Sequence, residues 1–184
     1  VPVRNLSMPV LESVGECAFA ETWINEVDLP STLRNISYGS FSSISFVKNY
    51  THNGEVNYTQ YDENNNPVWM ISEGVLYKYL ANGKLQLQSY PVNSDRTSYK
   101  VVEGTVRIDA YSFYSSSIKL TEITFPYSLE SIGDCALGGC DSIKDYYFNS
   151  YDAPVLEGVY NSALINYIYN LSEAQLTDKV DNLY

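Results

Sequence analysis

The chain has 184 residues, enough to bury one sizeable core, so a single domain is expected. Eighteen tyrosines and a charged fraction of only 18% are typical of a β-rich protein. A formal net charge of -11 argues against nucleic acid and anionic membranes as partners, because proteins that bind them neutralise phosphates with Lys and Arg. No apolar run approaches the roughly 20 residues that a transmembrane helix needs, so no membrane span is expected.

One phrase occurs four times along the chain. It reads MPVLESVGECAF from Met8, LPSTLRNISYGSF from Leu29, VEGTVRIDAYSF from Val102 and FPYSLESIGDCAL from Phe125. In each copy a Val or Ile precedes a closing Phe or Leu by five residues, as in Val14 and Phe19, Ile36 and Phe41, Ile108 and Phe113, and Ile132 and Leu137. Such repetition is typical of solenoids, in which each repeat buries its apolar side only by stacking on its neighbours.

A second phrase, apolar-x-x-apolar-x-apolar-Pro, lies between these copies. Ile24 to Pro30 matches Leu120 to Pro126, and Ile143 to Phe148 repeats it without the proline. The alternation predicts a strand with one buried face, and the proline ends that strand because it cannot donate to a ladder. We therefore predict repeats of about 21 to 24 residues, each with a strand, a turn, a short Leu-x-x-Ile segment and a small-residue loop.

Residues 53–98 break the period and are expected to form an inserted β-hairpin. Two strand-like runs, VWMISEGVLYKYL and KLQLQSYPV, are joined through Ala81 to Lys84. Asn82 and Gly83 both tolerate positive φ, so an Asn-Gly pair between alternating apolar runs predicts a type I′ turn.

The turn before this hairpin imitates a calcium loop. Its candidate ligands follow the EF-hand spacing: Asp62, Asn64, Asn66 and Glu73. Pro67 stands where an EF-hand needs Gly for its sharp turn, and no helices flank the segment. We expect a solvated Asn-rich turn and no metal site.

The C-terminal residues, 153–184, change character and predict a cap on the solenoid. Ser172 can cap a helix and Gln175 can reach back to it. Apolar residues then follow at helical spacing: Leu176, Val180 and Leu183. At the other end, Val3 to Pro9 already reads as a repeat strand with Leu6 and Met8 inward, so the chain is expected to begin in mid-array.

Together these phrases resemble the BspA-like leucine-rich repeat family of bacterial surface proteins. The motif L-P-x-S-L-x-x-I-G-x-x-A-F is met in residues 29–41 and 125–137, and the resemblance covers residues 1–52 and 99–152. It implies a β-rich leucine-rich-repeat solenoid with short strands, one β-hairpin insertion at 53–98 and a C-terminal helical cap at 153–184. Two departures are visible, because Leu137 replaces the usual Phe and Val106 sits one position late, which predicts a local bulge.

No motif predicts catalysis. His52 is the only histidine, and neither a nucleophile arrangement, a phosphate loop nor an HExxH sequence accompanies it, so it is expected to be an ordinary loop residue. The 22 acidic residues could include a glycosidase pair, but acids on a solenoid usually face water. We expect no enzyme activity, catalytic residue or cofactor.

The three cysteines lack metal-ligand spacing. Cys17 and Cys135 occupy the same position of two repeats, which favours a packing role. The spacing permits a disulfide between Cys135 and Cys140, but buried free thiols that act as small hydrophobes are the expected state.

Strand alternation predicts which side chains point outward, and stacking should align them in a ladder across the strand-bearing face. These residues are Asn5, Ser7, Glu26, Asp28, Glu122, Thr124, Asp145 and Tyr147. The resemblance implies a monomeric, non-catalytic, secreted or cell-surface interaction module, adhesin-like, that binds a host or matrix protein. The acidic ladder favours a basic protein partner. Two alternatives stay open: a carbohydrate-binding module that uses exposed Tyr, and a structural spacer within a larger surface protein.

Overall fold

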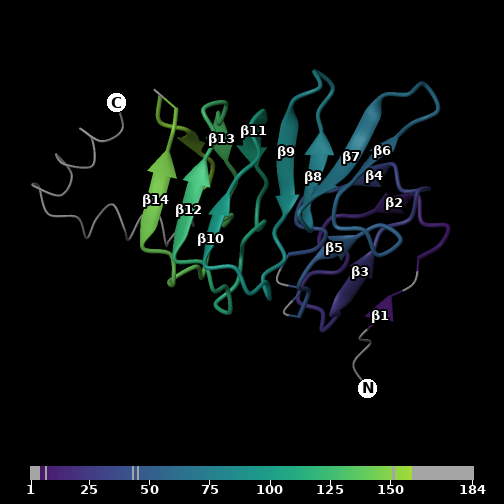
Figure 1. Ribbon diagram of the computed structural model, residues 1–184, viewed down its shortest axis with the longest axis horizontal. Helices are drawn as coiled ribbons and strands as arrows, with labels where there is room; N and C mark the ends of the chain where they lie inside the picture. Colours follow the sequence, from purple (N-terminus) through teal and green to yellow (C-terminus); the bar gives the residue numbers. More distant parts are fainter. Residues whose placement is uncertain (1–4, 7, 43, 45, 151, 159–184) are drawn as a thin grey trace, which may run out of the picture.

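The computed structural model describes residues 5–6, 8–42, 44, 46–150 and 152–158, which form short strands and contain no helix (Figure 1). The N-terminal stack consists of β1 (Asn5–Leu6), β2 (Ser13–Val14), β3 (Glu26–Asp28), β4 (Asn35–Ile36) and β5 (Tyr50–Thr51). The central strands are β6 (Tyr58–Tyr61), β7 (Pro67–Ser72), β8 (Val75–Tyr79) and β9 (Leu85–Ser89). The C-terminal stack consists of β10 (Ser98–Lys100), β11 (Thr105–Ile108), β12 (Glu122–Phe125), β13 (Ser131–Ile132), β14 (Asp145–Phe148) and β15 (Val155–Leu156).

Equivalent strands of successive repeats pair in parallel. One ladder of the N-terminal stack runs β1-β3-β5 and the other β2-β4, while the C-terminal stack has β10-β12-β14 and β11-β13-β15. The register reproduces the sequence repeat: Val14 pairs with Ile36, Ile108 with Ile132, and Ile132 with Leu156. The predicted leucine-rich-repeat solenoid is therefore confirmed as a β-solenoid of short strands.

A left-handed residue explains the constant five-residue step of the repeated phrase. It lies three positions after the inward Val or Ile and has φ of 51° at Cys17, 60° at Gly39, 59° at Tyr111 and 52° at Cys135. This conformation costs a non-Gly residue roughly 1–2 kcal/mol, so stacking must hold it in place. It does so by hydrogen bonds between coils, such as those from Cys17 N to Tyr38 O and from Tyr111 N to Asp134 O. The turn aims the closing Phe41, Phe113 or Leu137 into the core.

Strands β6 to β9 form an antiparallel meander, and β9 then pairs in parallel with β11, so a seven-stranded sheet runs β15-β13-β11-β9-β8-β7-β6. A turn at Asn82 and Gly83 joins β8 to β9 as predicted, and Leu80 N donates to Lys84 O there at 2.9 Å. The predicted type I′ geometry is wrong, because Gly83 has a positive φ of 75° but Asn82 does not. The predicted bulge is also present, because the β9–β11 register shifts between Thr105 and Arg107.

The central strands pack on two apolar cores, and Figure 1 shows β8 and β9 between the two stacks, with β7 and β6 beside the N-terminal stack. On β7 and β8, Trp69, Ile71 and Leu76 pack into the core of the N-terminal stack. Val75 and Tyr77 pack into the other core, with β9. The sheet therefore buries apolar residues on both faces.

The sequence run VWMISEGVLYKYL is not the single strand that was expected. It is divided between β7 and β8 at Glu73 and Gly74, whose φ values are 50° and 77°. Gly74 lies against the N-terminal stack, where Tyr50 N donates to Gly74 O at 2.8 Å and a Cβ on Gly74 would lie 2.8 Å from the Asn49 Cβ. Because both strands carry apolar residues on two faces, their continuous apolar pattern hides the turn.

Gly74→Ala is expected to unfold more easily than Gly83→Ala. Both glycines have positive φ, 77° and 75°, but a Cβ on Gly83 would meet nothing within 4 Å. The matched pair therefore separates left-handed strain from the close approach to Asn49, and the excess cost at Gly74 should be about 1–3 kcal/mol. Urea unfolding of the two variants measures it, and equal losses of stability would contradict the close packing of this turn.

A buried polar seam connects the two stacks through the central sheet. Gln88 on β9 donates from Nε2 to Ser37 O at 3.1 Å and to the Asp109 carboxylate at 2.6 Å. Lys78 on β8 donates from Nζ to Ile36 O at 3.0 Å. Asp109 is 2% exposed, and burial raises its pKa despite these donors. Gln88 and Lys78 thus link the central strands to the N-terminal stack, and Gln88 also links them to Asp109 of the C-terminal stack.

Asp109→Asn is expected to gain stability relative to the native chain as the pH rises from about 4 to 7. The pKa of Asp109 is raised in the folded state, so the Asp109 side chain contributes most to the stability of the folded protein below its unfolded pKa of about 3.9. That contribution is lost as the pH rises through the folded pKa, whereas Asn does not titrate. Urea unfolding of both chains across this range gives the difference, and a difference independent of pH would refute the assignment.

The predicted C-terminal helical cap lies outside the described residues, as does most of the segment 153–184 that was expected to form it. The described part of the chain offers no helix that could cross a bilayer.

Candidate interaction surface

The outward side chains of β3, β5, β10, β12 and β14 form a surface that we call the strand face. On the C-terminal stack the register aligns them in two rows, one of Ser98, Glu122 and Asp145, the other of Lys100, Thr124 and Tyr147. On the N-terminal stack Asp28 pairs with Thr51. The predicted alternation is present, since Val27, Leu29, Ile123 and Phe125 are at most 1% exposed.

The strand face is not the single ladder that the sequence predicted. Its members fall into two three-stranded sheets, β1-β3-β5 and β10-β12-β14. The turn at Glu73 and Gly74 inserts between them, bound to β5 by Tyr50 and to the residues before β10 by Arg96, whose Nη2 donates to Glu73 O. The sequence cannot reveal this interruption, because the insertion's contact with the two stacks is tertiary.

Asp95 joins the two halves along the loop edge of the face. Its carboxylate accepts hydrogen bonds from Lys119 Nζ at 2.5 Å and from Lys48 Nζ at 3.0 Å. These bonds, that from Lys119 first, lower the pKa of Asp95 to about 2. Both lysines are therefore paired to one carboxylate.

The predicted face residues differ in accessibility. Glu26, Asp28 and Glu122 are exposed, Tyr147 is 48% exposed, and Thr124 and Asp145 are half-buried. β1 pairs Asn5 with Glu26, but the Asn5 side chain and Ser7 lie outside the described structure. The fold thus brings Glu122, Thr124, Asp145 and Tyr147 together and places Glu26 and Asp28 on the other sheet.

Asp28 has a structural role in addition to its exposure. Its Oδ1 accepts from Thr51 Oγ1 at 2.8 Å and from Gly54 N at 3.1 Å. The carboxylate therefore holds the loop that follows β5 and is a weaker candidate for contact with a partner than Glu26.

Asp28→Ala is expected to destabilise the protein by about 1 kcal/mol, because two donors lose their acceptor at an exposed position. Asp28→Asn keeps an oxygen in place and should retain most of the stability. Thermal unfolding of the two variants distinguishes these outcomes. If Asp28→Asn lost as much stability as Asp28→Ala, the negative charge of Asp28 and not its acceptor oxygen would be what stabilises the loop.

Sequence reasoning missed three features of this surface. Glu73, with a side chain 72% exposed, adds a carboxylate at the interruption. Lys100 adds a cation to the row that contains Thr124 and Tyr147, and aligning residues 98–100 with β12 in the repeat would have revealed it. Trp23 and Phe46 are 61% and 45% exposed on the loops that enter β3 and β5, and each directly precedes an inward residue, Ile24 or Val47.

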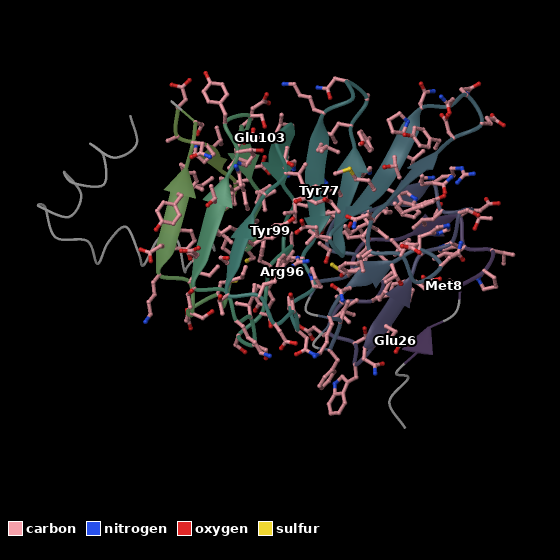
Figure 2. The ribbon with its side chains drawn as sticks, viewed as in Figure 1. Met8, Glu26, Tyr77, Arg96, Tyr99 and Glu103 are labelled. Carbon is pink, nitrogen blue, oxygen red and sulfur yellow. The ribbon has the colours of Figure 1, made fainter. Side chains whose placement is uncertain are left out.

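A buried tyrosine cluster lies beside Arg96, which binds the turn at Glu73 and Gly74. Figure 2 shows Tyr77, Tyr99 and Arg96 close together at the centre of the molecule, where the Tyr77 and Tyr99 hydroxyls share a hydrogen bond. Arg96 lies over the Tyr99 ring, with 5.7 Å from Cζ to the ring centroid. Burial raises the pKa of Tyr77 to about 12 and raises that of Tyr99 further. These phenols are structural and stay neutral.

His52 is not the ordinary loop residue that was expected. It is 8% exposed and its ring stacks on Tyr58, with 3.8 Å between centroids. Nδ1 donates to Leu29 O at 2.6 Å, and Nε2 accepts from the Asn53 amide at 3.1 Å. Because both ring nitrogens are hydrogen-bonded and the ring packs on Tyr58, His52 is a buried packing residue.

The cysteines are free thiols, as expected, but Cys17 is exposed and not buried. Cys135 and Cys140 are buried, and Cys140 Sγ donates to Phe113 O at 3.1 Å. Burial raises the pKa of Cys140 to about 12, so this thiol behaves as a packing group. Among the described residues, Cys17 contacts the following coil through the hydrogen bond from its N to Tyr38 O.

The Asn-rich turn is held by hydrogen bonds between its own residues. Asp62 Oδ1 accepts from the backbone N–H groups of Asn66 at 2.8 Å and Asn64 at 2.9 Å, and these bonds, that of Asn66 first, lower the pKa of Asp62. Within the described ranges no group of three or more His, Cys, Asp or Glu could hold a metal ion.

The comparison with known families agrees with the geometry. A family model described as the BspA type leucine rich repeat region matches residues 2–65 and 93–184, in six copies. The chain belongs to this family. Residues 66–92, which the family model leaves out, contain the antiparallel strands β7 to β9. No curated protein shows significant sequence similarity to the chain.

Three solved structures share the fold. A leucine rich cell surface protein from Faecalibacterium prausnitzii is 25% identical over 75% of this chain, with a TM-score of 0.62. The pneumococcal vaccine antigen PcpA is 22% identical over 77%, with a TM-score of 0.61. A leucine-rich repeat protein from Eubacterium ventriosum is 18% identical over 83%, with a TM-score of 0.54. The matches cover 33%, 32% and 44% of those chains, so this chain spans about a third of the first two.

Proposed function

We propose that the protein is a non-catalytic interaction module at the cell surface or outside the cell, and that it binds another protein through the strand face. The observation that carries this proposal is a set of exposed or half-exposed carboxylates. Glu26, Glu122 and Asp145 begin β3, β12 and β14 of the strand face, and Glu73 lies in the turn between its two sheets. Stacked repeats present such positions on a common surface, which suits a protein partner better than a small ligand.

The charge of the chain indicates the kind of partner. At a net charge of -11, a basic protein is attracted over several ångströms before contact, whereas an acidic one is repelled. Lys100 and the lysines held by Asp95 interrupt the acidic surface and would fix the register of the partner.

The relatives support the surface location. One is described as a cell surface protein and another as a vaccine antigen, which are terms for proteins met outside the cell. An adhesin-like role toward a host or matrix protein is the specific form of the proposal. A spacer role predicts no binding, and a carbohydrate-binding role predicts binding to glycans instead.

Reversing three carboxylates, Glu26→Lys, Glu122→Lys and Asp145→Lys together, should weaken binding to a protein partner by about tenfold or more. Binding is measured by interferometry against purified extracellular-matrix proteins at about 50 and 500 mM NaCl, and binding by the native chain should fall at high salt. A glycan array is screened in parallel.

The matched control reverses three exposed acids that lie in turns and not on the strands of the face: Glu63, Glu103 and Asp141. It changes the net charge equally and should preserve affinity. Equal effects of the two triple variants would reject the strand face, and glycan hits without protein binding would reject the protein partner. Absence of both kinds of binding would leave the spacer.

A further inference from the structure

We propose that Trp23 and Phe46 form the aromatic half of a binding site for an arginine side chain of the protein partner. This inference rests on the proposed function and names the partner chemistry that the strand face would select. The two rings are 61% and 45% exposed, and their centroids lie 6.0 Å apart with planes inclined at 55°. The inclination leaves ring surface open to solvent, unlike in a stacked pair.

The pair is placed by the repeat. Trp23 and Phe46 precede Ile24 and Val47, which are 3% and 0% exposed, so the alternation that buries one residue turns its neighbour outward. The loops they occupy enter β3 and β5, two adjacent strands of the strand face. Exposed Trp is common where proteins meet other proteins, since it supplies large contact area with little loss of side-chain freedom.

The other tryptophan shows what a structural role looks like. Trp69 is 0% exposed and its Nε1–H donates to Leu33 O at 3.0 Å. It packs in the core of the N-terminal stack, whereas Trp23 keeps most of its surface in water.

The charges around Trp23 favour a cation. Exposed acids flank it in the chain, Glu21 two residues before and Glu26 three residues after. The nearest lysine in the chain to Phe46 is Lys48, which is paired with Asp95. A guanidinium can stack on an aromatic face while its N–H groups bind carboxylates, whereas an ammonium is a compact, strongly hydrated charge. A neutral sugar could stack on the rings and donate hydroxyl hydrogen bonds to the acids, but it carries no charge for the acids to attract.

The protein contains the same combination within its own chain. Arg96 lies over the Tyr99 ring at 5.7 Å and its Nη2 lies 4.0 Å from the Glu73 carboxylate. Figure 2 shows Arg96 beside Tyr99, and Glu26 on the part of the strand face formed by the N-terminal stack. The proposed site repeats this aromatic–arginine–carboxylate arrangement with the arginine supplied from outside.

Tryptophan fluorescence tests the inference directly. Because Trp69 is fully buried, a change in emission on adding a soluble peptide reports mainly on Trp23. The probes are capped peptides of alternating Arg and Ser, with Lys–Ser and Glu–Ser peptides of equal length and a set of neutral oligosaccharides. We expect a saturable change with the Arg peptide at severalfold lower concentration than with the Lys peptide, and none with the Glu peptide.

Variants complete the test with the Arg peptide immobilised for interferometry. Trp23→Ala and Phe46→Ala should each weaken binding at least about fivefold, as an aromatic partner of a cation would. Tyr127→Ala is the matched control, because Tyr127 is 59% exposed but lies after the end of β12, whereas Trp23 and Phe46 lie before the start of β3 and β5. It should bind like the native chain. Equal binding of Arg and Lys peptides, equal loss in all three variants, or a saturable response to a neutral oligosaccharide would overturn the proposal.

The outcome is distinguishable from failure of the proposed function. If the charge reversal on the strand face abolishes binding of a matrix protein while Trp23→Ala does not, the face is right and the arginine site is wrong. If Trp23→Ala and Phe46→Ala weaken binding of the Arg peptide but the triple charge-reversal variant binds protein normally, the arginine site is supported and the strand face is rejected.

Discussion

A stack of parallel β coils ends in an open apolar surface, and this protein has two such stacks that meet at one sheet. The strands β7 and β8 carry apolar residues on both faces, with Trp69 and Ile71 on one side and Val75 and Tyr77 on the other. One small sheet therefore closes the inner end of each stack, which neither stack could do for itself. The pairing of β9 with β11 makes this sheet continuous with the C-terminal stack, while Gln88 and Lys78 anchor it to the N-terminal stack.

This arrangement also shapes the surface. The tip of the β7–β8 hairpin must reach the N-terminal stack, so Gly74 docks beside Asn49 and the strand face is divided there. The division is bridged by polar groups and not left open: Arg96 binds the Glu73 carbonyl, and Asp95 binds lysines from both stacks. A partner that spans the face would meet two acidic areas separated by ion-paired lysines and Arg96, which specifies its position more closely than a uniform acidic ladder would.

The sequence predicts the repeats and the positions of turns, but not the type of the turn at Asn82 and Gly83, where only Gly83 has positive φ. Repeats, the alternation of Val27 and Leu29 with Glu26 and Asp28, the Asn82–Gly83 turn and the bulge at Val106 follow from spacing, turn chemistry and the family pattern, and the structure contains them. It fails where tertiary contact decides. The turn at Glu73 is hidden in an apolar run, and His52 reads as a loop residue because its ring partner, Tyr58, lies across a turn. The division of the ladder depends on where the insertion docks, which no repeat pattern encodes.

The exposed aromatic pair adds what carboxylates alone lack. Ion pairs between exposed groups are screened by salt and contribute little net affinity, so an acidic face mainly speeds encounter and excludes wrong partners. Burying the rings of Trp23 and Phe46 under a partner side chain would instead remove apolar area from water, a contribution that salt does not weaken. Because the two rings belong to adjacent repeats, a partner that covers both is also oriented along the stack. Affinity would then come mainly from the aromatic pair, and the rate of association from the acidic face.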